Sequence, residues 1–79
     1  MRVDKFLKVS RIIKRRTIAN EACDAGRVMI NGKVVKAGAE GKIGDIIEIQ
    51  FGNNTTKIEV LDLKESTKKE DAVNMYKSL

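Results

Sequence analysis

The sequence predicts one small α+β domain, in which two N-terminal helices pack on a twisted, mostly antiparallel sheet and a C-terminal helix follows. Three observations predict this fold. Apolar residues recur at helical spacing near the N-terminus, an Asn-Gly pair separates two β-type runs, and a third β-type run follows a glycine-rich loop. A chain of 79 residues supports a single core, because small chains bury only a modest part of their surface.

The first helix is expected over about residues 2–9, where Val3, Phe6 and Leu7 recur at helical spacing. Basic residues fall between these apolar residues at steps of three, at Arg2, Lys5 and Lys8. We therefore expect the helix to turn an apolar face toward the core and a basic face toward solvent.

Residues 10–14 are expected to connect the first helix to the second. The second helix should begin near Arg15 to Thr17 and end at Gly26, because glycine readily takes the left-handed conformation that follows a helix. The apolar residues that we assign to the core in this part of the chain are Ile12, Ile13, Ile18, Ala19, Ala22, Cys23 and Ala25.

A β-hairpin is the clearest local prediction. Two β-type runs, at 28–30 and 33–35, are separated by Asn31-Gly32. A tight type I′ turn needs positive φ at both of its central residues, and Asn-Gly meets this requirement. We therefore assign Asn31 first of all to the turn.

Two more strands are expected in the second half of the chain. Residues 37–45 should form a glycine-rich crossing loop, and residues 46–51 should form a strand. A turn at 52–54 should lead into a returning strand over 57–63.

The C-terminal segment, residues 66–79, is expected to form a helix that follows the domain of residues 1–65. Thr67 and Glu70 have the spacing of a capping box at its start. Its expected apolar stripe consists of Ala72, Val73, Tyr76 and Leu79.

The charge of the protein is concentrated in its first half. Residues 2–36 contain ten basic and three acidic residues, a net charge of +7, whereas the remainder contains six basic and eight acidic residues. The overall charge is +5. This asymmetry predicts a surface that faces a polyanion, and nucleic acid is the first candidate.

Catalysis and metal binding are not expected. The chain has no histidine and one cysteine, so the commonest general base is absent and a cysteine zinc site cannot form. The run GAEGKIGD lacks the spacing of a phosphate-binding loop. We expect a non-enzyme without cofactor or metal. The single cysteine, the lack of a run of about 18 apolar residues and the lack of an apolar signal core favour a cytoplasmic protein with no membrane partner.

Several segments of the chain resemble the RNA-binding domain of the ribosomal-protein-S-four type, also called the alpha-L RNA-binding motif. They are R-x-D-K-F-L from Arg2, the arginine Arg16, and G-R-V-x-I-N-G-K-V-V-K from Gly26, followed by a Gly-Asp pair. This resemblance covers about residues 1–50. The whole chain, including T-K-K-E-D-A-V-N-M-Y from Thr67, further resembles the RqcP family of bacterial ribosome-associated quality-control factors, which is related to heat-shock protein fifteen.

The resemblance implies binding to stalled large ribosomal subunits that hold peptidyl-tRNA, through ribosomal RNA and the P-site tRNA. It also implies support of template-independent alanine tailing of the nascent chain, alongside a partner that recruits alanyl-tRNA. We expect a monomer off the ribosome. The heat-shock relatives leave an alternative open, namely recycling or rescue of split large subunits without tail synthesis.

The resemblance and the charge pattern together predict the RNA-binding residues Arg2, Asp4, Lys5, Lys8, Arg11, Lys14, Arg15, Arg16, Arg27, Asn31 and Lys33. Arginine presents a planar fork of donors to phosphate, and a helix start adds backbone N–H groups. The acidic position of the family, here Asp4, is expected to orient neighbouring arginines. The family often has serine before Arg16, where this chain has Arg15. The helix is therefore capped by another group or begins at Thr17.

Other interpretations remain open. The run Lys14-Arg15-Arg16 is also compatible with a solvated surface, and Asp4 with an acid that favours the helix dipole. A basic module that contacts a protein or an anionic membrane would also explain the charge. Because the chain has only three aromatic residues and no tryptophan, base-stacking platforms of the RRM or single-strand type are not expected.

Overall fold

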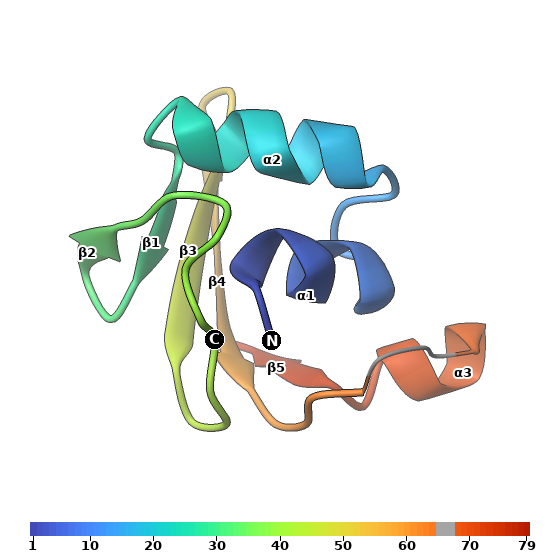
Figure 1. The fold of residues 1–79 in the computed structure, drawn as a ribbon. Helices are drawn as coiled ribbons and strands as arrows, with labels where there is room; N and C mark the ends of the chain where they lie inside the picture. The colour runs from blue at the N-terminus through green and yellow to red at the C-terminus, as the bar shows by residue number, and fades with distance from the viewer. Residues whose placement is uncertain (65–67) are drawn as a thin grey trace.

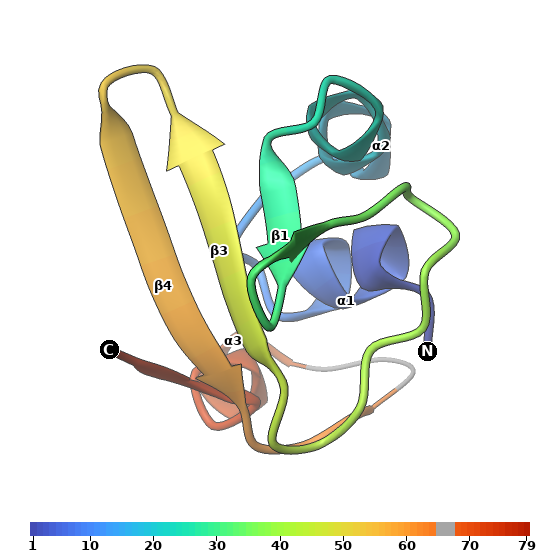
Figure 2. The same cartoon turned by 90° about the vertical axis from the view of Figure 1, so that its left-hand side faces the viewer.

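The computed structural model describes residues 1–64 and 68–79, which form two layers (Figure 1). The elements are α1 (Val3–Val9), α2 (Arg16–Asp24), β1 (Val28–Ile30), β2 (Lys33–Val34), β3 (Ile46–Phe51), β4 (Asn54–Val60), α3 (Lys69–Ala72) and β5 (Tyr76–Ser78). The five strands form one sheet in the order β2-β1-β3-β4-β5, and every neighbouring pair is antiparallel. Helices α1 and α2 lie on the same face of this sheet (Figure 2). The predicted α+β class is confirmed.

The core lies between the two long helices and the sheet. Helix α1 buries Val3, Phe6 and Leu7 completely, as its apolar spacing predicts. The strands contribute buried residues at alternate positions of β3 and β4, namely Ile47, Ile49, Ile58 and Val60. This alternation is the expected pattern of a sheet with one covered face.

Helix α2 buries a narrower stripe than the sequence predicts. Ala19 and Cys23, which are four residues apart on one face, are fully buried, whereas Ile18 and Ala25 are exposed. The assignment of Ile18 and Ala25 to the core is therefore wrong. The small residues at 19 and 23 allow the helix to approach the rest of the core closely.

The β1–β2 hairpin has the predicted turn. Asn31 and Gly32 both have positive φ, at 51° and 83°. The Asn31 side chain also joins the hairpin to the start of β3, because its Oδ1 accepts from the Ile46 N–H at 2.9 Å and its Nδ2 donates to Asp45 Oδ1 at 3.1 Å. The sequence predicts the turn but not these two contacts.

Strand β4 begins three residues earlier than predicted. Phe51 pairs with Asn54 across a two-residue turn, in which Gly52 has a φ of +57°. The strand therefore includes the polar residues 54–56 and ends at Val60.

The crossing loop after β2 holds the start of the chain. The Val3 N–H donates to the Ala39 carbonyl and the Gly41 N–H donates to the Met1 carbonyl, each at 2.8 Å. Figure 2 shows this loop running beside the N-terminal end of α1. These contacts fix the backbone on both sides of Arg2.

The C-terminal helix is present, but it is shorter than predicted. Helix α3 has four residues, and the chain then forms β5, which pairs with β4. The open edge of β4 supplies backbone partners that a longer helix would leave unused. The expected apolar stripe is wrong in part, since Val73 and Leu79 are exposed while Met75 is fully buried. The predicted cap at Thr67 lies outside the described residues.

Within the described part of the chain, no helix has the length and apolar character needed to cross a membrane.

The burial of Met75 yields a test of the C-terminal structure. Met75→Ala should lower the free energy of unfolding by about 2–5 kcal/mol, because it removes a fully buried side chain and leaves a cavity. Val73→Ala is the matched control, since Val73 is 62% exposed, and it should change the stability by less than about 0.5 kcal/mol. Urea unfolding followed by circular dichroism measures both values. If Met75→Ala were as stable as the wild type, the C-terminal segment would not pack into the core through Met75.

Candidate nucleic-acid interface

The carboxylate of Asp4 is the centre of the candidate site. Asp4 is in the first turn of α1, and only 1% of the residue is exposed. Its Oδ1 accepts from the Lys5 N–H at 2.8 Å, and its Oδ2 accepts from Asn20 Nδ2 at 3.4 Å. A buried carboxylate needs such donors, because an unpaired buried charge is costly.

Two arginines bind this carboxylate from different elements. The Nε of Arg2 lies 3.3 Å from Asp4 Oδ1, and the Nε of Arg16 lies 3.5 Å from Asp4 Oδ2. The side chains of Arg2 and Arg16 are 49% and 47% exposed. Each guanidinium is therefore held by the protein and still presents an accessible part to solvent. The predicted role of Asp4 as the residue that orients neighbouring arginines agrees with this geometry.

The chain between the helices brings these groups together. Arg11 has a φ of 63°, a left-handed conformation that turns the chain after α1. The Ile13 N–H then donates to the Leu7 carbonyl at 3.0 Å, and the Ile13 side chain is buried. Because this connector is anchored, Arg16 at the start of α2 lies beside Asp4. Asn20 follows Arg16 by four residues and therefore lies on the same face of α2.

The start of α2 settles the question raised by Arg15. The helix begins at Arg16, and Arg15 occupies the N-cap position with extended backbone. No side chain among the described residues caps this end. The first N–H groups of the helix and the positive end of its dipole therefore lie beside exposed basic side chains, which are Lys14, Arg15 and Arg16.

A hollow of about 440 Å³ opens at this site. It is lined by Arg2, Asp4, Arg16, Thr17, Asn20 and Glu21. The lining combines two arginines with two carboxylates, Asp4 and Glu21, and the excess of positive charge at this end of α2 comes from the exposed Lys14 and Arg15. The arrangement suits an anion such as a phosphate group, because arginine and a helix start both donate hydrogen bonds to phosphate oxygens.

The other predicted site residues are distributed over a wider surface. Lys8, Arg11 and Lys14 are exposed near the connector of the two helices. Arg27 follows the opposite end of α2, and Lys33 lies in the edge strand β2 (Figure 1). The structure therefore does not place all predicted cations around one point. The predicted RNA contacts of these residues and of Lys5 and Asn31 stay predictions.

Asn20 is a member of the site that sequence reasoning missed. Its amide holds the Asp4 carboxylate, so it supports the position of both arginines. The spacing of four residues from Arg16 was the available signal, but this spacing has meaning only when α1 is known to pack beside that face of α2.

The contacts of Asp4 also change its acidity. Burial alone would raise the pKa of Asp4, but the hydrogen bonds from Asn20 and from the Lys5 N–H, together with the charge of Arg16, bring the pKa below its ordinary value. The carboxylate therefore stays ionised at neutral pH and keeps its contacts with the arginines.

Metal binding has no structural support in the described residues. Within residues 1–64 and 68–79, no three His, Cys, Asp or Glu side chains gather as a metal site. Cys23 is a buried free thiol of the core.

Comparisons with known proteins identify the class of the protein. The family profile described as S4 domain matches residues 1–47, which include helices α1 and α2, the β1–β2 hairpin and the Asp4 cluster. The structure of heat shock protein 15 from Vibrio cholerae, which was solved as a trimer, superposes with a TM-score of 0.92 at 25% identity. The superposition covers 100% of this chain and 81% of that chain. The fold and the site thus define an S4-domain protein.

Two curated relatives identify the family more closely. Both are named RQC P-site tRNA stabilizing factor. The relative from Streptococcus pneumoniae is 55% identical over 76 residues, which are 96% of this chain and 86% of the relative. The relative from Bacillus subtilis is 54% identical over 76 residues, which are 96% of this chain and 88% of the relative. The chain belongs to this family of S4-domain proteins, as the resemblance in its sequence predicts.

The acidity of Asp4 yields a test by pH. Because its pKa is lower in the folded state than in the unfolded state, Asp4 stabilises the fold above the unfolded pKa. This contribution should be lost as the pH falls from about 4 through the folded pKa. Urea unfolding at a series of pH values should show a steeper acid loss of stability in the wild type than in Asp4→Asn. Asp24→Asn, which alters an exposed acid, is the control and should keep the steep loss. Identical profiles for wild type and Asp4→Asn would contradict the assignment.

The Cys23 thiol yields a second test. Burial, followed by the negative charges of Asp4 and Asp24, raises the pKa of Cys23 to about 11. At pH 8 the native protein should therefore react with Ellman's reagent much more slowly than the urea-unfolded chain, because the thiolate is the reacting form. Equal rates in the two states would show that Cys23 is accessible.

Proposed function

We propose that this protein binds RNA in ribosome-associated quality control and stabilises tRNA in the P site of the large ribosomal subunit. The name of the two relatives, RQC P-site tRNA stabilizing factor, supports this proposal. The observation that carries it for this chain is the pair of half-exposed arginines, Arg2 and Arg16, held around one buried carboxylate. This arrangement positions two guanidinium groups for the RNA backbone before any RNA binds.

The finer proposal concerns the alanine tail that is added to a stalled nascent chain. The chain acts on stalled large subunits with peptidyl-tRNA and supports template-independent alanine tailing, together with a partner that recruits alanyl-tRNA. It acts as a cytoplasmic non-enzyme and is a monomer off the ribosome. Ribosomal RNA and the P-site tRNA are its proposed ligands. The basic N-terminal half suits these two polyanionic ligands.

A second candidate is recycling or rescue of split large subunits without tail synthesis. The likeness to the heat shock protein 15 structure favours it. Alanine tails on stalled nascent chains, measured in cells with and without the protein, separate the two candidates. Loss of the tails supports the first, whereas unchanged tails with slower clearance of obstructed subunits support the second.

A membrane-surface role fits the structure poorly. Val3, Phe6 and Leu7 of α1 are completely buried, so the basic helix has none of these side chains available for insertion into lipid.

Cosedimentation with purified large ribosomal subunits tests RNA binding. Arg2→Ala/Arg16→Ala should weaken binding by about tenfold or more, because it removes two charge-assisted hydrogen-bonding groups. It should also reduce the dependence of binding on salt concentration, since removing one cation from a phosphate lowers the salt slope by about one. The matched control is Lys68→Ala/Lys77→Ala, which removes the same charge from exposed positions in the C-terminal segment and should bind nearly as the wild type does. Equally weakened binding in the two double variants would show that only net charge matters.

A further inference from the structure

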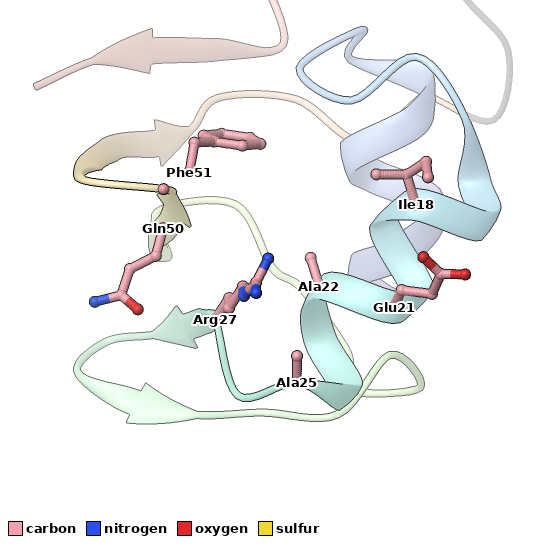
Figure 3. Close-up of a pocket in the computed structure, with 8 residues that line it drawn as sticks. Ile18, Glu21, Ala22, Ala25, Arg27, Gln50 and Phe51 are labelled. Carbon is pink, nitrogen blue, oxygen red and sulfur yellow. The ribbon is translucent and has the colours of Figure 1, made fainter.

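A second hollow lies between α2 and the tip of the β3–β4 hairpin (Figure 3). Its volume is about 390 Å³. In Figure 3, Phe51 projects from the end of β3 toward α2, and Ile18 projects from α2 toward the same space. Arg27 extends between the two elements.

The walls of this hollow include apolar groups that the core does not use. Phe51 is 40% exposed and Ile18 is 47% exposed. Phe51 is the last residue of β3, and the positive φ of Gly52 turns the chain immediately after it. The Phe51 side chain is therefore partly accessible where it lines the hollow.

Arg27 adds an uncommitted positive charge. Whereas Arg2 and Arg16 are paired with Asp4, Arg27 has no ion pair with any carboxylate of the described residues. Glu21 lies in the wall formed by α2. Phe51, Arg27 and Glu21 thus line one open space, and in Figure 3 the Glu21 carboxylate points away from Phe51 and Arg27.

The two hollows are neighbours. Glu21 lines both this hollow and the one around the Asp4 cluster. A strand of RNA bound at Arg2 and Arg16 therefore has a path along α2 toward Phe51.

We propose that this second hollow is a subsite for one unpaired RNA base, which stacks on Phe51. Arg27 contacts an adjoining phosphate. Glu21 disfavours a phosphate at its own position, because like charges repel. The proposal rests on the proposed function, since it requires that the protein binds RNA.

The charges favour a base over an apolar side chain of a partner protein. An apolar side chain would cover Phe51 and Ile18 but would leave Arg27 without an anion. A nucleotide supplies both a flat apolar face and a phosphate. A single ring is also consistent with the small number of aromatic residues, because the subsite takes one base and is not an extended platform.

The test compares two RNA hexamers of equal charge, one with six adenines and one with six abasic residues. Fluorescence anisotropy at low salt gives the affinity of the wild type for each. The wild type should prefer the adenine hexamer by about fivefold or more, because stacking on an aromatic ring stabilises the bound base. Phe51→Leu should lose most of this preference, and Phe51→Tyr, which keeps the ring, should retain it.

Arg27→Gln separates the phosphate contact from the base contact. It should weaken binding of both hexamers by a similar factor, because its proposed partner is the backbone. Circular dichroism of each variant checks that the fold is intact. Phe51→Tyr is the variant whose side chain is closest in shape to that of the wild type.

An unchanged preference in Phe51→Leu would overturn the subsite, and so would a wild type that binds the two hexamers equally. If Phe51→Leu loses binding to large subunits but keeps the wild-type preference between hexamers, a protein side chain occupies the hollow and the proposal is wrong. These results are separate from the proposed function, which depends on the response of large-subunit binding to the removal of Arg2 and Arg16.

Discussion

The rest of the site depends on one interaction, the burial of the Asp4 carboxylate between α1 and α2. Removing a carboxylate from water is costly, and only good donors offset that cost. Here the donors come from Arg2, Arg16, Asn20 and the Lys5 N–H. An apolar residue at this position could also pack, but it could not hold two arginines of like charge side by side. The Asp4 carboxylate therefore holds the two arginines in place. It can do so because the packing of α1 against α2 brings Arg16 next to it.

The local parts of the fold could be predicted from the sequence, whereas the long-range pairings could not. The Asn31-Gly32 turn and the run 46–51 are determined by neighbouring residues, and both were predicted correctly. Strand β5 depends on the open edge of β4, more than ten residues away in sequence. The capping pattern and the apolar spacing near Ala72 favour a helix locally. The edge of the sheet competes with that preference, and the helix ends after four residues.

The candidate site was predictable as a set of residues but not as an arrangement. The family pattern includes Arg2, Asp4 and Arg16, and the structure brings these three together. The predicted helix from about Arg16 to Gly26 already separates Arg27 from Arg16, but charge alone did not divide the predicted cations between the two ends of α2. The spacing of Asn20 from Arg16 does not by itself reveal its role, since a polar residue within a helix usually faces water.

The side chain of Asn31 has a chemical consequence for the protein. An asparagine followed by glycine is the sequence most prone to spontaneous deamidation, because glycine leaves its backbone nitrogen free to attack the amide. Here the amide nitrogen donates to Asp45, at 3.1 Å. Conversion of Asn31 to an acid would replace that donor with a second carboxylate and place two negative charges side by side. Deamidation of Asn31 would therefore weaken the contact between the β1–β2 hairpin and β3. The stability of a purified sample during storage thus depends on the same residue that forms the turn.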